Sequence, residues 1–298
     1  IGYNKGTGQL LFRDDVPSPS LWISGRNSGE RANISQGEFR SPASGTQRHG
    51  YLMVTNDGAV LNAFLDQWVL GSLIASGANA DAGGRGTAVI RNGTIDVNDI
   101  ILGRGLSTVT VGAAYGWLTL LDGTMTVNNS VVLGEKLGGG NIAGTLTLSG
   151  GVTTVSGDIR DGGGTSTLIL DGGTLDMQNN AIGSLGNPID TLTMASGVLR
   201  NVGQINGGAG WSKTGAGTLT LEGTHAYGGT LSVAGGALLY NGTYTGGGLI
   251  SVQNSAVLGG TGSVAGIFVA SGGTLSPGLS PGKLTASGDV TMEPGAVF

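Results

Sequence analysis

The sequence predicts an all-β fold, a right-handed parallel β-helix. Three observations predict it: the glycine content, the Asn-Gly and Asp-Gly turns, and a repeating unit. The chain includes 61 Gly but only 7 Pro, whereas the usual share of Gly is roughly 7%. Val, Leu, Ile and Thr fill the stretches between the glycines. This composition is typical of short strands joined by tight turns, and not of collagen or a flexible linker.

Three consecutive units can be aligned through their cores. Each has an alternating strand, an Asn-Gly or Asp-Gly turn, a second alternating strand and an apolar run that ends in Leu-Gly. The closing glycines Gly71, Gly103 and Gly134 recur at an interval of about 31 to 32 residues, and a looser version of the pattern continues from Leu146 at intervals of about 22 to 27 residues. Such self-similarity is the signature of a solenoid, whose stacked coils share one core.

Two other interpretations compete with the solenoid. The apolar residues of 61–74 also fit helical spacing, but the aligned segments 95–103 and 125–134 are strand-like, so we expect a strand there. An antiparallel sandwich or barrel would also use Asn-Gly and Asp-Gly turns. The recurring repeat length favours the solenoid, with Leu, Val and Ile pointing inward and Thr and Ser facing water.

The composition of residues 1–50 predicts an N-terminal cap or assembly segment, followed by the solenoid at 51–298. The first segment holds six of the 14 basic residues and only eight of the 61 Gly. A cap is expected because the open end of a solenoid presents unpaired strand edges. We expect Trp22, Phe12 and Phe39 to supply its apolar plug.

A binding face is the alternative role for this segment. Four acidic residues lie among its six basic ones, which leaves a net charge of only +2 and favours a solvated cap. The arginines that would form such a face are Arg13, Arg26, Arg31, Arg40 and Arg48.

Charge and composition exclude several classes of function. A net charge of −5 and a pI near 4.9 leave no basic face for nucleic acid. The absence of Cys excludes thiol nucleophiles, disulfides and iron–sulfur centres. No apolar run approaches the length of a membrane-spanning helix. Because the chain opens at Ile1 without Met or a signal-like segment, we expect a processed or trimmed piece of a longer secreted precursor.

From Trp211 the sequence contains an ordered set of motifs that includes Gly217-Thr-Leu-Thr-Leu221 and Val257-Leu-Gly-Gly-Thr-Gly262. This ordered set resembles the autotransporter-associated β-strand repeat of bacterial surface proteins. This resemblance implies a right-handed β-helix in a passenger domain, displayed at the outer membrane, with a chiefly structural role. His225 stands where the family usually has Asn. The residues that carry the resemblance are Trp211, Lys213, Gly215, Gly217 to Leu221, Gly223, Tyr227, Gly229 to Leu231, Val233, Gly236, Val257 to Gly262, Gly272 to Gly278 and Ser280 to Gly282.

Residues able to carry catalysis are few. Only His49 and His225 could act as near-neutral bases, and neither has a nucleophile in a recognisable motif. The alternative function, a polysaccharide-degrading lyase or hydrolase, would use paired carboxylates. The densest group of candidates is Asp158, Arg160, Asp161, Asp171 and Asp176. Asp161 and Asp171 adjoin Gly, where Asp is favoured simply for turn geometry, so we expect no catalytic residues.

The sequence predicts no metal or cofactor. Calcium-binding solenoids repeat a Gly- and Asp-rich nonapeptide, and Asp161-Gly-Gly-Gly and Asp171-Gly-Gly do not recur at that interval. A less favoured alternative is an ice-binding face of stacked Thr-Xaa-Thr pairs, because Thr is common wherever a strand meets water. The pairs are Thr108/Thr110, Thr124/Thr126, Thr145/Thr147, Thr165/Thr167, Thr191/Thr193 and Thr218/Thr220.

The function expected from these patterns is that of a secreted or cell-surface structural or adhesive module. Its partners would be other copies of itself, in oligomers or fibres, or a surface glycan or a ligand on a host or neighbouring cell. We expect any specificity to lie in loops at 72–86, 104–116 and 135–144.

Overall fold

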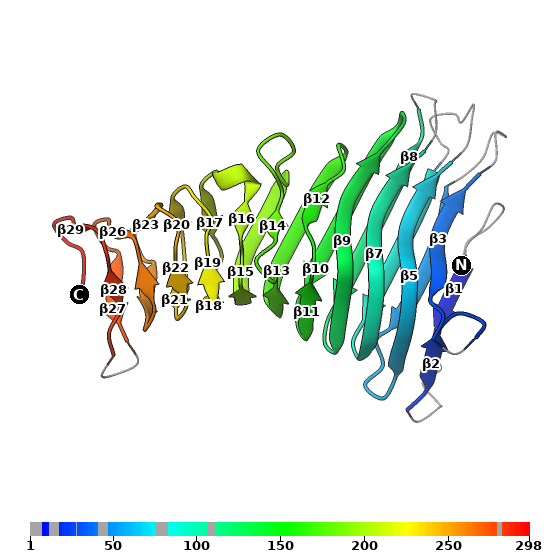
Figure 1. Cartoon of the computed structure of the whole chain (residues 1–298), viewed down its shortest axis with the longest axis horizontal. Coiled ribbons are helices and arrows are strands. Elements are labelled where there is room, and N and C mark those ends of the chain that lie inside the picture. Colours follow the sequence, from blue (N-terminus) through cyan, green and yellow to red (C-terminus); the bar gives the residue numbers. More distant parts are fainter. Residues whose placement is uncertain are drawn as a thin grey trace.

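The computed structural model describes residues 8–11, 18–27, 29–40, 47–74, 83–106, 111–278 and 282–298. It is a stack of coils in which each strand pairs in parallel with the equivalent strand of the next coil (Figure 1). This confirms the predicted parallel β-helix and excludes the antiparallel sandwich. Within these residues the only helix is a 3₁₀ turn, η1 (Asn206–Gly208), and no helix is long and apolar enough to cross a membrane.

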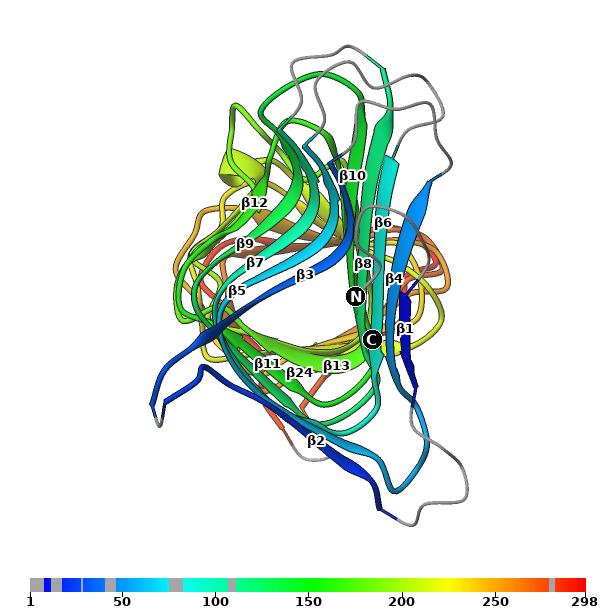
Figure 2. The same cartoon turned by 90° about the vertical axis from the view of Figure 1, so that its right-hand side faces the viewer.

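The coils have three sides, which Figure 2 shows end-on. The first face contains β1 (Gly8–Leu11), β4 (Arg48–Val54), β6 (Gly83–Ile90), β8 (Ala113–Leu120), β10 (Asn141–Leu148), the starts of β13 (Thr165–Asp176) and β15 (Thr191–Arg200), β17 (Trp211–Lys213), β20 (Leu231–Val233), β23 (Leu249–Val252), β26 (Gly266–Val269) and β29 (Val290–Met292).

The second face contains β2 (Ser20–Ile23), the starts of β5 (Val60–Leu73), β7 (Gly93–Gly105) and β9 (Thr124–Lys136), then β11 (Val152–Val155), the ends of β13 and β15, β18 (Thr218–Glu222), β21 (Ala237–Tyr240), β24 (Val257–Gly260) and β27 (Thr274–Pro277).

The third face contains β3 (Ala32–Phe39), the ends of β5, β7 and β9, then β12 (Ile159–Asp161), β14 (Ala181–Ile182) and β16 (Gln204–Ile205). In the later coils a separate sheet takes this side. Its strands are β19 (Thr224–His225), β22 (Thr243–Tyr244), β25 (Ser263–Val264) and β28 (Thr285–Ala286).

Inward-facing side chains form continuous columns through the stack. On the first face Leu52 pairs with Ala88, Ala88 with Leu118, and the column continues through Leu146 to Leu168. All five side chains are at most 1% exposed. One coil cannot bury its own core, so this shared column supplies the hydrophobic stabilisation of the stack.

In the first unit, Val60–Leu73 forms the strand β5, as predicted, and the side chain of Trp68 is fully buried. The predicted alignment is wrong at its turn, because Leu61 and not Gly58 pairs with Gly93. The first turn therefore contains more residues than the later ones, which the glycine spacing alone did not reveal.

The closing glycines Gly71, Gly103 and Gly134 lie where the third face approaches the first face so closely that a side chain would not fit. Gly71 has φ of 70°, in the left-handed region that other residues rarely adopt. A Cβ at Gly71 would collide with the backbone of Tyr115, and a Cβ at Gly116 would collide with the backbone of the third face. The two faces thus meet backbone to backbone along a line that we call the glycine seam. Its members are Gly37, Gly71, Gly103 and Gly134 on the third face and Gly86, Gly116 and Gly144 on the first.

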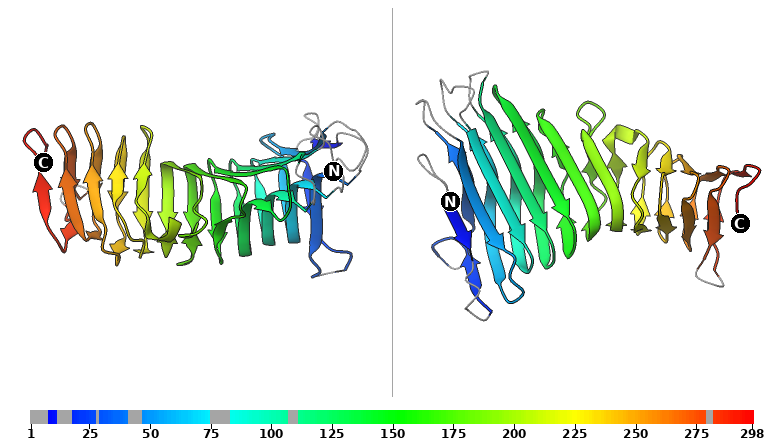
Figure 3. Two further views of the ribbon diagram at one scale, coloured as in Figure 1. Left: turned by 90° about the horizontal axis from the view of Figure 1, so that it is seen from above. Right: turned by 180° about the vertical axis from the view of Figure 1, so that it is seen from behind.

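Beyond the glycine seam the two faces enclose a second apolar cluster. It consists of Phe39, Leu73, Ala114 and Ile142, and it is separate from the main core. Figure 2 shows this outer part as the upper extension formed by the blue to green strands. The coils that carry it are the wide ones of Figure 1, and the stack narrows toward the C-terminal strands (Figure 3).

The predicted apolar plug of residues 1–50 is wrong for Trp22. This residue is 71% exposed and lines a hollow of about 440 Å³ beside Phe64. Phe39 is buried as expected, whereas Phe12 and Arg13 lie outside the described residues. β1, β2 and β3 pair in parallel with β4 and β5, so strand pairing continues across residue 50, and a distinct cap stays a prediction.

The predicted loops at 72–86, 104–116 and 135–144 are too wide, because β5 to β10 extend into all three. Residues 75–82 and 107–110 within them lie outside the described part of the chain. Gly86 and Gly116, which end two of these ranges, are strand residues of the glycine seam. They are needed for close packing of two faces and not for a turn.

Candidate binding surface

Outward side chains of the first face gather aromatic residues on the wide coils. Parallel register places His49 beside Arg85 and Arg85 beside Tyr115 in one column. In the next column, Tyr51 lies beside Thr87, and Thr87 beside Trp117. We call His49, Tyr51, Arg85, Tyr115 and Trp117 the aromatic platform. All of its side chains are partly exposed.

Contacts within the aromatic platform hold its rings in place. The rings of His49 and Tyr51 stack with centroids 5.8 Å apart, and Nδ1 of His49 is 3.0 Å from the Tyr51 hydroxyl. Tyr115 and Trp117 stack with centroids 5.6 Å apart and an interplanar angle of 27°. The Arg85 guanidinium lies 5.1 Å from the centre of the Tyr115 ring, a cation–π contact. The platform is therefore pre-organised.

The aromatic platform has one charged side chain, Arg85. Burial, followed by the charge of Arg85, lowers the pKa of His49, so His49 is neutral near pH 7 and Arg85 is the charged member. No carboxylate of the described residues forms an ion pair with Arg85, and its Nε atom is buried without a hydrogen-bond partner. Tyr115 also lines an adjoining hollow of about 470 Å³ with Lys136, Asn141 and Thr165.

Threonines continue the first face beyond the platform. Thr145, Thr167 and Thr191 are in register in one column, but in the next column Ile169 separates Thr147 from Thr193. The pairs Thr124/Thr126 and Thr218/Thr220 lie on the second face. Thr108 and Thr110 lie outside the described residues. The predicted Thr pairs are thus divided between two faces, and the ice-binding alternative stays a prediction.

A second outward surface lies on the third face, which is concave where it bends toward the glycine seam (Figure 2). Val69, Ile101 and Val132 form an apolar strip there and are at most 9% exposed. The charged groups around it are already paired, Arg40 with Glu38 and Arg104 with Glu135. This surface therefore satisfies its own charges, in contrast with Arg85 on the aromatic platform.

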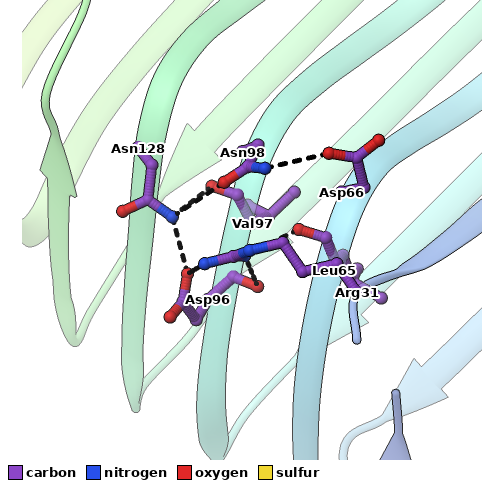
Figure 4. Close-up of polar contacts among 7 residues, drawn as sticks. All are labelled: Arg31, Leu65, Asp66, Asp96, Val97, Asn98 and Asn128. Atoms are coloured by element: carbon purple, nitrogen blue, oxygen red, sulfur yellow. Dashed lines mark hydrogen bonds and ion pairs between the residues drawn. The ribbon is translucent and has the colours of Figure 1, made fainter. Parts of the chain in front are cut away.

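Arg31 joins the first three coils at the outer surface (Figure 4). Its guanidinium donates to the carbonyl of Leu65 at 2.8 Å, to the carbonyl of Asp96 at 3.2 Å and to Oδ1 of Asp96 at 2.8 Å. It also lies 4.0 Å from the centre of the Phe64 ring. Arg31 is therefore a structural clamp and not a free binding group.

Amides and carboxylates continue this network from coil to coil. Nδ2 of Asn98 donates to Oδ1 of Asp66 at 2.9 Å, and Nδ2 of Asn128 donates to Oδ1 of Asp96 at 2.7 Å (Figure 4). Of the other predicted arginines, Arg40 pairs with Glu38 and Arg48 lies 5.7 Å from the centre of the Phe39 ring, while Arg26 is exposed. The described arginines of residues 1–50 are mostly engaged in separate contacts.

The predicted carboxylate group is not assembled into one site. Asp158 accepts a hydrogen bond from the backbone N–H of Ala181, Asp171 from the Ser196 hydroxyl, and Asp176 from the backbone N–H of Gln178 and the amide of Asn201. Asp158 precedes the third-face strand β12, whereas Asp176 lies on the second face. Arg160 donates to the Ser130 hydroxyl at 3.0 Å. These side chains mainly satisfy turns and neighbouring coils.

Asp161 is the exception, because it lies near a second carboxylate. Burial raises the pKa of Asp161, and the negative charge of Asp190 adds to this effect. Asp190 accepts a hydrogen bond from the backbone N–H of Ser166 at 2.9 Å. No group of three or more metal-ligating side chains occurs within the described ranges.

The second histidine, His225, is fully buried inside the coils of residues 211–298, which we call the narrow coils. Its ring contacts Tyr227 and Tyr240, each with centroids 5.8 Å away. Burial lowers the pKa of His225 to about 4, partly opposed by the Glu222 backbone. His225 therefore packs inside the repeat against two tyrosine rings, and its lack of a catalytic role stays a prediction.

Lys213 explains much of the motif that begins at Trp211. It is fully buried, and its ammonium donates to the carbonyls of Thr214, Gly215, Gly217 and Gly235 at 2.7 to 2.9 Å. These contacts compensate the buried charge. The Lys and Gly positions of the motif thus form one cage, which is a structural element of the core.

The platform residues were missed in the sequence because they are spread over residues 49 to 117. The available signal was the repeat marked by the closing glycines, which brings outward positions of different units into columns. Only the register of β4, β6 and β8 shows that these five side chains are neighbours.

The fold and these surfaces define a parallel β-helix with wide coils that present a partly exposed aromatic face. The chain is 30% identical over 287 residues to the adhesin BmaC autotransporter of Brucella suis biovar 1 (strain 1330). The match covers 84% of this chain and 8% of that protein, so the chain spans less than a tenth of its curated relative. No family model and no solved structure matches the chain.

Proposed function

We propose that this chain is an adhesive segment of a larger, autotransporter-type protein, displayed on a bacterial surface. The observation that carries this proposal is the similarity to an autotransporter adhesin over 84% of the chain. The stacked fold supports it, because a continuous column of paired strands makes a stiff body that holds its lateral faces away from an anchor.

The wide coils are the proposed adhesive part. Their outward side chains include the aromatic platform, which lies beside the hollow, whereas the narrow coils bury His225, Tyr240 and Lys213. We propose the narrow coils as the structural part, in agreement with the resemblance of residues 211–298 to a structural repeat. Self-association through a lateral face is a second mode of adhesion in this proposal.

Surface display tests the adhesive role. The chain would be fused to an unrelated outer-membrane carrier in a non-adherent bacterium, with the carrier alone as control and surface exposure verified by antibody. We expect increased attachment to host-cell monolayers, to bacterial lawns or to glycan-coated plates, or clumping of the displaying cells. Equal behaviour of the two strains on all four readouts would refute an adhesive role.

A polysaccharide-degrading enzyme remains the alternative, and the observation that favours testing it is that burial and the negative charge of Asp190 raise the pKa of Asp161. The purified chain would be incubated with uronic-acid polymers and the products separated by size. The adhesive proposal predicts no released oligosaccharides. The control is Asp122, an exposed carboxylate that accepts a hydrogen bond from the backbone N–H of Gly123 in a turn. Release that Asp161→Ala abolishes, and that Asp122→Ala preserves, would establish the enzyme instead.

A further inference from the structure

The strongest unassigned feature is the aromatic platform with its cation, Arg85. We propose that the platform binds a carboxylate-bearing sugar of a surface glycan, with the ring on Tyr51 and Trp117 and the carboxylate on Arg85. This inference rests on the adhesive role proposed above and specifies its ligand class.

The column arrangement places a small residue between two aromatic side chains, and we take the space above it as the slot for the sugar ring. Tyr51 and Trp117 are separated by a single small residue, Thr87, on the intervening strand. Neighbouring strands are roughly 4.8 Å apart, so the two aromatic side chains start about 10 Å apart. A sugar ring can lie between them over Thr87, with its apolar C–H face against an aromatic ring and its hydroxyl groups toward solvent.

Charge selects the kind of sugar. The chain as a whole carries −5, yet within the described residues neither Arg85 nor Lys136 has a carboxylate partner. The planar guanidinium of Arg binds carboxylates with two parallel hydrogen bonds. Its position over the Tyr115 ring fixes its plane and reduces the entropy lost on binding.

The adjoining hollow extends the site. Lys136, Asn141 and Thr165 line it beside Tyr115, so a cation and hydroxyl-binding groups lie next to the platform. A glycan whose first sugar occupies the slot can place its next sugar in this hollow of about 470 Å³. We therefore expect an acidic oligosaccharide to bind more tightly than a single acidic sugar.

An acidic peptide is less suitable for this surface. Extended peptides usually bind by adding a strand to a sheet edge, but β4, β6, β8 and β10 are each paired on both sides. Their backbone groups are therefore already satisfied, and the platform offers only side chains. Side chains with exposed ring faces, hydroxyls and a guanidinium complement a sugar better than a peptide backbone.

Calorimetry with defined glycans tests the proposal on the full chain. The probes are trigalacturonate, its methyl-esterified form, sialyllactose and lactose, so that uronate and sialate sources are distinguished. We expect binding of one acidic probe and a loss of about tenfold or more for its neutral counterpart, because charge-assisted hydrogen bonds contribute about 1.5 kcal/mol or more.

Variants separate the site from the rest of the surface. Arg85→Gln and Trp117→Ala should each weaken binding about tenfold or more, Arg85→Lys should retain part of it, and Arg91→Gln should have no effect. Circular dichroism would check folding. No binding of either acidic probe to the folded chain, equal binding of neutral probes, or unchanged binding in both platform variants would each overturn the proposal.

The display assay distinguishes failure of this proposal from failure of the adhesive role. Equal adhesion of cells that display Arg85→Gln or Trp117→Ala would support the adhesive role but refute this binding site. No adhesion of cells that display the original chain would refute the adhesive role itself. Adhesion competed by an acidic peptide and not by acidic sugars would replace the glycan with a protein ligand.

Discussion

The wide N-terminal coils and the narrow C-terminal coils use the same parallel pairing but stabilise some of their charged side chains in different ways. In the wide coils, the ion pair Arg31–Asp96 connects the first coil to the third, and the ion pair Arg104–Glu135 connects two neighbouring coils. In the narrow coils, His225 and Lys213 are fully buried, and Lys213 donates to backbone carbonyls. Every ion pair between described residues ends at or before Glu222.

This difference follows from how each coil closes. A wide coil closes by contact of two faces along the glycine seam, which separates the outer apolar cluster from the main core. A narrow coil has no such seam, and its short strands leave carbonyls at the corners that Lys213 satisfies from inside. The wide coils are therefore extended enough to present a flat outward face.

The largest expected effect is at the glycine seam. Gly116→Val would force a side chain against backbone atoms of the third face, and these cannot move without separating two sheets. We expect destabilisation of about 3 kcal/mol or more, measured by urea unfolding. Gly186→Ala is the control, because nothing lies within 4 Å of its Cβ position. Equal stability of the two variants would mean that the seam does not close the wide coils.

The second largest expected effect is a pH dependence of the free energy of unfolding that arises from His225 in the narrow coils. An unfolded His has a pKa near 6.5, whereas His225 in the folded chain has a pKa of about 4. The folded state therefore binds fewer protons, and the stability due to neutral His225 is complete above pH 6.5 and lost as the pH falls through 4. The full loss is about 3 kcal/mol.

The measurement is urea unfolding from pH 7 to pH 4, with His225→Asn and His49→Asn compared with the original chain. We expect His225→Asn to flatten the pH dependence and His49→Asn, at a partly exposed position, to change it much less. The same steep acid destabilisation in His225→Asn would assign it to other groups.

The smallest expected effect concerns the attachment of the first coil. Arg31→Ala removes three hydrogen bonds to Leu65 and Asp96, which we expect to cost about 2 kcal/mol. Hydrogen exchange should increase in β2 and β3 and remain unchanged in the narrow coils. Arg91→Ala is the control, because its partner Asp57 is 98% exposed and such a pair contributes little. Uniform exchange changes along the whole stack would contradict a local clamp.

Much of the fold could be predicted because the repeat is local in origin. Alternating strands, Gly turns and the closing glycines Gly71, Gly103 and Gly134 occur in each unit, so the solenoid follows from one unit seen several times. The widths of the loops and the place of Trp22 were predicted wrongly. Glycine has the same appearance in a sequence whether it serves a turn or, like Gly86, a close contact between sheets.

The sequence by itself determined the parallel β-helix, the inward columns of Leu, Val and Ile, and the absence of thiol chemistry, because these depend on composition and short-range periodicity. Only the tertiary structure decided which outward residues are neighbours. His49, Arg85 and Tyr115 are far apart in the chain but adjacent in register. Their proximity depends on the length of each coil, which is set by contacts between faces and not by any local pattern.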